Sequence, residues 1–292
     1  MKPRGHHGTV YTVTTVAGGR SRTAAADTAT ADRSSAPRAR PATGAARRLT
    51  GLALAAATTA AALAGCQSGT DPRQHDTTSY SVSGHVRTLV VSTHVGNVQI
   101  AGGAAVAISV TQHVAFHGAA PTISRRLAAG TLSLSSHCAP DSACSVSYDI
   151  TVPRATAVRV TDDVGAVRLS ALTGHVTVTV DAGRIDLSAL SGPLEATTRA
   201  GSITGQQLSS AHASLLVTAG AIDLTFSAPP AAFTATTGIG AVILRVPNTV
   251  PYRVAASATV GHIGISVTQD TAAARTITIS TKVGSITISA AP

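Results

Sequence analysis

The sequence predicts an all-β protein built as a solenoid-like stack of short strands. The first observation is a glycine that recurs every 18 to 23 residues, and a period near 20 residues is typical of repeat architectures. These repeat glycines are Gly165, Gly183, Gly201, Gly220, Gly240, Gly261 and Gly284. The second observation is that apolar residues stand two and four positions after the glycines, which predicts one buried face of a strand.

The best copy of the repeat is VGAVRLS at Val164–Ser170, and an earlier copy, VGNVQIA, begins at Val95. Among the seven later copies, the position four residues after the glycine is apolar except at Gly205. We expect each repeat glycine to supply either a bend with a positive φ or a close backbone approach that a Cβ would block.

A second set of alternating segments lies between the glycine-containing strands. These segments cover residues 175–181, 193–199, 213–219, 232–237, 252–259 and 275–281. One period is therefore strand, turn, strand, turn, a unit too thin to bury its own apolar face unless neighbours stack on it. The alternative architecture is a β-sandwich or meander of hairpins, since short strands at regular spacing fit that arrangement too.

Before the repeats, strands are expected over residues 85–93, 97–102 and 105–116, and residues 121–130 are expected to form a short helical or irregular insertion. Cys138 and Cys144 flank a short loop between alternating segments. We expect them to form a disulfide, which persists in an oxidising compartment. A metal or redox site is the alternative, although neither a C-x-x-C motif nor zinc spacing is present.

The net charge of +9 is concentrated in the first part of the chain. Residues 1–65 hold nine of the 22 Lys and Arg residues and two of the 13 acids, which leaves residues 66–292 with a net charge of +2. This near-neutral segment has few aromatic residues, so the sequence predicts no nucleic-acid binding. Residues 1–48 are rich in Ala, Arg, Thr, Ser, Gly and Pro, which predicts a disordered basic extension. A mis-assigned translation start is an alternative explanation of this extension.

Residues 49–65 form an apolar run preceded by Arg47 and Arg48, a pattern typical of the hydrophobic region of a signal peptide. The LAGC sequence that ends at Cys66 resembles the lipobox of bacterial lipoproteins. In that family the cysteine carries the lipid and becomes the mature N-terminus, so the resemblance implies lipidation of Cys66 and attachment to the membrane. Residues 66–80 are then expected to form a polar tether, and residues 81–292 the β-repeat domain.

From Ile150 onward the sequence resembles the bacterial putative-adhesin β-strand-repeat family, a domain of unknown function. The resemblance rests on an apolar strand ending in Val152-Pro153, followed by Gly-x-Ile/Val turns and L-x-G corners, and it covers about residues 80–290. The usual Ser-Gly-Asp-Ile turn of that family is replaced here by Val-Gly or Ala-Gly without the Asp. The resemblance implies an adhesive role.

The sequence offers few candidates for catalysis. Asp186 and Asp223 each follow a repeat glycine by three residues and are expected to share one outward column, roughly 10 Å apart at the usual strand spacing. Such a pair is compatible with glycoside hydrolysis, but solvated strand residues are the preferred interpretation. Asp162 and Asp163 are candidate calcium ligands, but no other repeat carries in-phase acids. We therefore predict no enzyme activity, no metal and no cofactor.

These observations together predict a non-catalytic, lipid-anchored protein on the outer face of the cytoplasmic membrane or the cell surface. Its expected role is adhesion or ligand binding through the β-repeat surface, with an envelope glycan or protein as partner. The alternatives are a structural scaffold or subunit of an envelope assembly and, third, a glycan-active β-solenoid enzyme. The sequence does not determine the oligomeric state or the hand of the stack.

Overall fold

The structure, a computed structural model, describes residues 15–16, 73–140 and 142–292, and it confirms the all-β prediction. The strands are β1 (Thr15–Val16), β2 (Gln74–Val82), β3 (Thr88–Gly103), β4 (Ile108–His117), β5 (Thr122–Ala128), β6 (Thr131–His137), β7 (Ala143–Pro153), β8 (Ala157–Ser170), β9 (Val176–Ser188), β10 (Leu194–Leu208), β11 (His212–Ala219), β12 (Ile222–Phe226), β13 (Ala232–Ile239), β14 (Val242–Val246), β15 (Arg253–Val260), β16 (Ile263–Ser266), β17 (Thr276–Val283) and β18 (Ile286–Ala290). The described residues include no helix that is long and apolar enough to cross a membrane.

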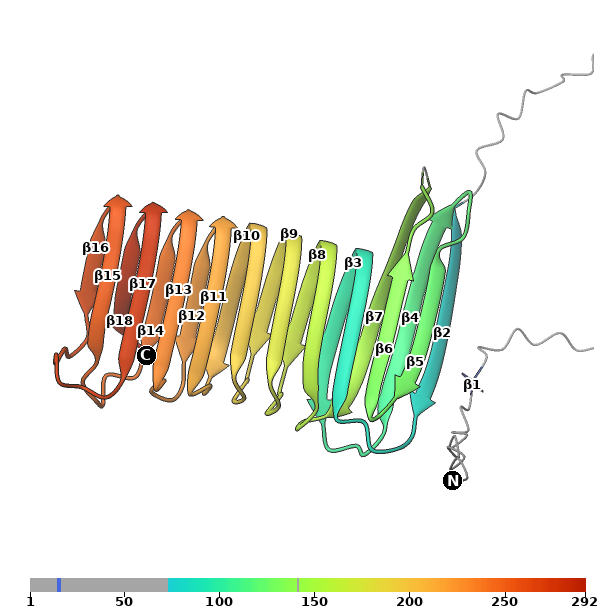
Figure 1. The fold of residues 1–292 in the computed structure, drawn as a ribbon, viewed down its shortest axis with the longest axis horizontal. Coiled ribbons are helices and arrows are strands. Elements are labelled where there is room, and N and C mark those ends of the chain that lie inside the picture. Colours follow the sequence, from blue (N-terminus) through green and yellow to red (C-terminus); the bar gives the residue numbers. More distant parts are fainter. Residues whose placement is uncertain (1–14, 17–72, 141) are drawn as a thin grey trace, which may run out of the picture. The chain divides into compact units, whose positions relative to one another are not determined.

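The repeats stack as coils, each pairing in parallel with the next. Gly165 of β8 is opposite Gly183 of β9, which is opposite Gly201 of β10. In β3, β8, β9 and β10 one continuous strand passes through the glycine, whereas later coils consist of two strands each: β11 with β12, β13 with β14, β15 with β16, and β17 with β18. Figure 1 shows β11 and β13 in front of β12 and β14, so each coil contributes a strand to two opposed layers.

The last two coils stack in the reverse of their chain order. β17 pairs with β13 on one side and with β15 on the other, so the C-terminal coil lies inside the stack and the β15/β16 coil lies at its end. Side-chain size explains this order. The inner coil buries Ile277 and Ile279 almost completely, whereas the end coil presents the smaller Val254 and Ala256 at the matching positions. Placing the isoleucines inside removes more apolar surface from water.

The repeat glycines stack directly on one another. A Cβ built on Gly220 would lie 1.6 Å from the carbonyl oxygen of Gly201, and the φ of Gly220 is +142°. A Cβ built on Gly165 would lie 1.7 Å from the carbonyl oxygen of Gly96, although Gly165 is not among the glycines with positive φ. Any other residue in this column would force neighbouring backbones apart.

The core lies between the two layers, and its residues extend from Tyr80 to Ile288 in the described part of the chain.

Gly205, the exception in the apolar pattern, is explained by a bulge that follows it in β10. The register of β10 shifts between Gly205 and Leu208, and Gln207 has a φ of +55°. Leu208 folds into the space, because a Cβ on Gly205 would lie 2.9 Å from a methyl of Leu208.

Two expectations for the N-terminal part were wrong. The expected insertion at residues 121–130 is strand β5, which forms a hairpin with β6 through Ala129 and Gly130. These two residues have φ angles of +49° and +76°, as a two-residue hairpin turn requires. Strand β2 begins at Gln74, inside the predicted tether 66–80, because it pairs antiparallel with β4 along its whole length.

The predicted basic extension 1–48, the signal segment 49–65 and Cys66 lie outside the described residues, apart from β1. That two-residue strand, Thr15–Val16, pairs antiparallel with Ser79 and Tyr80 of β2.

Candidate functional site

The front layer of the stack presents two straight rows of hydroxyl side chains. The pairing register aligns Thr179 with Thr197, and Thr236 with Ser280. We call the outward residues of these rows the hydroxyl face: Thr177, Thr179, Thr197, Ser214, Thr234, Thr236, Thr278 and Ser280. The rows form because successive side chains of a strand point to opposite faces, and threonine and serine alternate with buried aliphatic residues.

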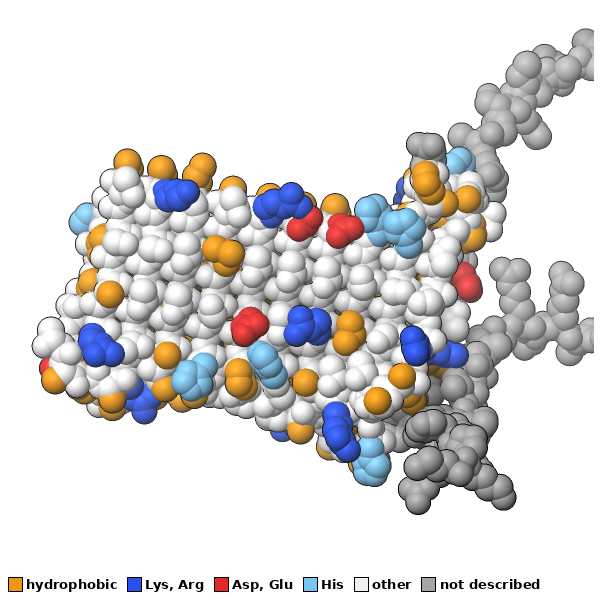
Figure 2. All heavy atoms as spheres, in the orientation of Figure 1, with side chains coloured by type: hydrophobic (Ala, Val, Ile, Leu, Met, Phe, Trp, Pro, Cys, Tyr) orange, Lys and Arg blue, Asp and Glu red, His pale blue; other side chains and the backbone are white. Residues whose placement is uncertain are grey.

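Glu195 and Leu216 interrupt the hydroxyl face, one in each row. The Leu216 side chain is 47% exposed, although adjacent coils carry threonine at its position. In Figure 2 most of this face is white, because side chains that are neither charged nor apolar cover it. The face therefore offers a regular grid of donors and acceptors around one apolar side chain.

The opposite layer carries the column that contains Asp186 and Asp223. The register places Asp186 opposite Thr204, and Thr204 opposite Asp223, so the two acids lie in one column and two coils apart. Asp186 accepts a hydrogen bond of 2.7 Å from Thr204 and lies 3.3 Å from the guanidinium of Arg168. Arg245 binds Asp223 at 2.5 Å. Each carboxylate therefore has a cationic neighbour of its own.

A shallow depression of about 370 Å³ lies over this column. Its polar lining includes Gln99, Arg168, Asp186, Thr204 and Gln206. The lining contains no aromatic side chain, so a sugar ring would be held by hydrogen bonds alone. The depression suits a small polar group of a larger ligand better than an isolated substrate.

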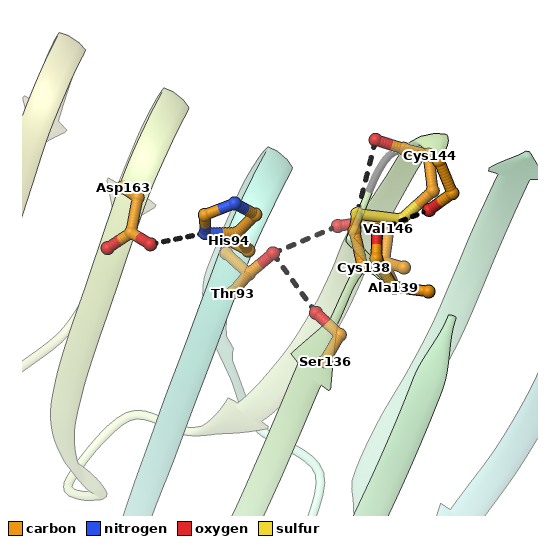
Figure 3. The surroundings of a disulfide bond; sticks show 9 residues. Thr93, His94, Ser136, Cys138, Ala139, Cys144, Val146 and Asp163 are labelled. Atoms are coloured by element: carbon orange, nitrogen blue, oxygen red, sulfur yellow. Dashed lines mark hydrogen bonds and ion pairs between the residues drawn. A yellow bond between two sulfur atoms is a disulfide. The ribbon is translucent and has the colours of Figure 1, made fainter.

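A third candidate site lies at the corner of the stack beside the disulfide (Figure 3). Nδ1 of His94 lies 2.5 Å from a carboxylate oxygen of Asp163, and the His137 ring centroid lies 5.6 Å from that of His94. Cys138 and Cys144 form a disulfide there, and together with the two histidines they line a depression of about 510 Å³.

The hydroxyl groups of Thr93 and Ser136 cannot serve as a nucleophile for which His94 is the base. Thr93 precedes His94 in β3 and therefore points to the other side of the sheet. Its hydroxyl donates to the carbonyl of Val146 at 3.3 Å and accepts from Ser136 at 3.1 Å. The His–Asp pair and the hydroxyl pair thus lie on opposite sides of β3, so a nucleophile–base–acid relay does not form among these residues.

Asp162 is the most unusual ionisable group in the described residues. It is 1% exposed, and neither carboxyl oxygen has a hydrogen bond of good geometry. The pKa of Asp162 is raised to about 7, mainly by burial and in smaller part by the Asp163 charge, against the opposing effects of the Val164 N–H and His94. Asp162 points into the core while Asp163 points outward, so the two acids do not converge on one cation.

Asp162 belongs to a buried column of mostly polar residues, interrupted by Val180 and Val217, that the sequence pattern contains but that we did not predict. The column occupies the position three residues before the repeat glycine. Thr237 and Thr281 each donate to the carbonyl oxygen of the glycine one coil earlier, at 3.4 Å. The sequence signal that could have revealed this column is a threonine three residues before the glycine, which occurs at Thr93, Thr198, Thr237 and Thr281.

In the part of the chain that the structure describes, no group of three or more His, Cys, Asp or Glu residues could hold a metal ion. The lipidation prediction at Cys66 lies outside that part.

Comparison with known proteins gives only a weak likeness to a solved structure. No family model matches the sequence, and no curated protein matches it. Among solved structures the chain is similar to a crystal structure described as a putative cell adhesion protein from Clostridium sporogenes. The two share 11% identity over 75% of this chain and 99% of that chain, with a TM-score of 0.32. Likeness at this level shows neither a family nor a function, so the resemblance to the putative-adhesin family stays a prediction.

Proposed function

We propose that this protein is a lipid-anchored, extracytoplasmic and non-catalytic protein that binds a glycan or protein partner at the cell envelope. The hydroxyl face is the proposed binding surface. The observation that supports this proposal best is the pair of hydroxyl rows held in register by parallel pairing from β9 to β17. The membrane anchor rests on the lipobox resemblance at Cys66.

Binding would consist of many weak contacts rather than one deep pocket. Threonine and serine hydroxyls both donate and accept, so they match the hydroxyl groups of a polysaccharide or the backbone of an extended peptide. Each contact replaces a hydrogen bond to water and contributes little by itself. A rigid grid of such groups loses little conformational entropy on binding, which favours a long ligand over a short one.

The geometry of the acids supports the non-catalytic part of the proposal. Glycoside hydrolysis needs one carboxyl group as an acid and another as a base or nucleophile across the bond. Asp186 and Asp223 instead each bind an arginine of their own, Arg168 and Arg245, and lie in one column rather than on two sides of an open space.

A scaffold role is the second candidate function, and one observation favours it. The coil formed by β15 and β16 leaves its inward side chains partly exposed at the end of the stack. Such an end is suited to assembly with another protein surface.

The binding proposal is tested with the fragment from residue 67 to residue 292, which contains every core residue from Tyr80 to Ile288. The fragment is incubated with wall polysaccharide and, separately, with membrane-protein extract from the producing organism. We expect saturable retention on one of the two. No retention on either would refute the binding role and favour the scaffold.

A matched pair of variants locates the surface. Thr236 and Thr287 are both exposed threonines of inner coils, one on the hydroxyl face and one on the opposite layer. Thr236→Lys should weaken retention by about tenfold, equivalent to about 1.4 kcal/mol, while Thr287→Lys should leave it unchanged. Equal effects of the two variants would contradict the assignment to the hydroxyl face.

A further inference from the structure

At one end of the stack β15 and β16 have no further strand beside them among the described residues. Residues 268–270 cover this edge just before β15, where the N–H of Tyr252 donates to the carbonyl of Thr268 and its carbonyl accepts from Asp270. β15 pairs only with β17, and β16 pairs only with β18, among the described residues. The N–H of Arg253 donates to the carbonyl of Arg275, on the β17 side. In a parallel pair alternate residues bond to opposite neighbours, so Val254, Ala256 and Ala258 direct their N–H and C=O groups to the free edge.

The core is also open at this end. The inner coil buries Ile277, Ile279, Ile286 and Ile288 to 1% exposure or less. Three of the equivalent inward residues of the end coil are only half-buried: Val254, Ala256 and Ile265. The side chain of Ile263, opposite Ile286, is 36% exposed.

An exposed apolar strip runs along the corner of the stack into the open end. The residues before the repeat glycines of the last three coils are Ile239, Val283 and Val260, which the register places side by side. Their exposed fractions are 62%, 47% and 60%. The open core and this strip together form a continuous apolar surface, which we call the open-end surface.

Apart from the part beside Tyr252 that residues 268–270 cover, the edge lacks the features that normally prevent strands from pairing. Natural edge strands carry lysine, proline, inward-facing charge or bulges. β15 has one charged residue, Arg253, at its first position, and β16 has none. The register of both strands with their neighbours is unbroken.

The opposite end of the stack is built differently. There β2 and β4 run antiparallel, and the guanidinium of Arg125 in β5 lies 4.2 Å from the centre of the Tyr80 ring. Arg126 follows Arg125 on the same strand. The two arginines at this end do not complement the apolar open end, so a head-to-tail fibre is disfavoured.

We infer that the open-end surface binds the same surface of a second copy of this chain, forming a closed two-fold dimer. With the two-fold axis passing through both layers, β15 runs antiparallel to its counterpart and β16 does the same. A two-fold interface is self-complementary, so one edge suffices and association stops at two copies. In a pairing centred on β15 the two Arg253 side chains lie at opposite ends, where they do not repel each other.

The size of the open end agrees with a weak but specific dimer. Eight residues of β15 span about 26 Å, and two layers about 10 Å apart with their side chains give a width of about 20 Å. Each copy would bury roughly 500 Å², or about 1,000 Å² in total, which is at the lower limit for specific interfaces. We therefore expect a monomer–dimer equilibrium in the micromolar range. This inference does not depend on the ligand of the hydroxyl face.

Sedimentation velocity of the fragment 67–292, from about 1 to 200 µM, tests the inference. Ala256→Lys places a charge in the proposed interface from both copies, and it should raise the dissociation constant about 100-fold or more. Ala255→Lys is the matched control, because Ala255 is adjacent in β15 but points away from the core and is exposed. It should leave the dissociation constant within about threefold of wild type.

A second variant keeps the test valid if Ala256→Lys does not fold. Ala256→Pro removes an N–H that faces the free edge and makes no bond within the chain, so it should fold and stay monomeric. Hydrogen exchange should show protection of the Val254, Ala256 and Ala258 amides that appears only at dimer-forming concentrations.

Three results would each overturn the inference. The first is a wild-type monomer throughout the concentration range, with or without protected edge amides. Protected amides in a monomer would mean that another segment of the chain covers the edge. The second is growth beyond two copies, and the third is a dimer insensitive to both Ala256 variants.

Discussion

Substituting alanine for the stacked glycine Gly220 should prevent the coils from packing. The added Cβ would lie 1.6 Å from the carbonyl oxygen of Gly201, about half of an ordinary contact distance. The backbone fixes the position of the Cβ, and the oxygen is itself a backbone atom, so no side-chain rotation relieves the clash. The φ of +142° adds a second cost, because residues with a Cβ rarely adopt it. We expect a loss of more than about 4 kcal/mol in the free energy of unfolding.

Two other glycines separate the steric cost from the conformational cost. Gly118 has a φ of +81° and open space around its Cβ position, so Gly118→Ala should cost only about 1–2 kcal/mol. Gly264 has no positive φ, and its nearest neighbour would be 3.9 Å from the Cβ. Gly264→Ala should therefore change stability by less than about 1 kcal/mol, in either direction.

Urea unfolding followed by far-ultraviolet circular dichroism measures all three variants, because the chain has no tryptophan. The expected order of destabilisation is Gly220→Ala, then Gly118→Ala, then Gly264→Ala. If Gly220→Ala were no more destabilised than Gly118→Ala, the glycine column would not be in backbone contact, and the stacking account would be refuted.

Three further predictions concern individual side chains. The folded-state pKa of Asp162 is about 7, above its ordinary value of 3.8, so stability should be greatest below about pH 4, fall by on the order of 4 kcal/mol up to pH 7, and level off above it. Asp162→Thr should abolish most of this fall in urea unfolding measured between pH 4 and 8, and an unchanged profile would mean that another group titrates. Replacing both Cys138 and Cys144 with alanine should lower the unfolding free energy by about 2 kcal/mol, with reduction of the wild type giving the same urea midpoint shift. Arg245→Ala should cost less than about 1 kcal/mol, and less still in high salt, because its pairing with Asp223 is partly exposed.

The architecture could be predicted because it depends on short-range periodicity. A glycine in phase with alternating apolar residues requires the same local backbone in every repeat, and parallel stacking follows from burying those residues. The order of the last two coils could not be predicted from that pattern. It depends on whether Ile277 and Ile279 or the smaller Val254 and Ala256 occupy the end of the stack, which is a comparison between distant segments.

The candidate sites were predictable to different degrees. Asp186 and Asp223 could be placed in one column because the repeat fixes their phase. Their pairing with Arg168 and Arg245 depends on side chains of neighbouring coils. The contact between His94 and Asp163 joins residues 69 positions apart, and it forms because β3 stacks directly on β8. No local pattern contains that information.

The predicted attachment at Cys66 underlies the whole envelope role, and one measurement tests it directly. The full chain is expressed in its own organism, purified from the membrane fraction, and its N-terminal peptide is analysed by mass spectrometry. We predict a peptide that begins at Cys66 and carries the mass of a diacylglyceryl group, whereas Cys66→Ser should leave the protein unprocessed and without lipid. A mature protein that begins elsewhere with an unmodified Cys66 would contradict the lipid anchor and, with it, the proposed location at the envelope.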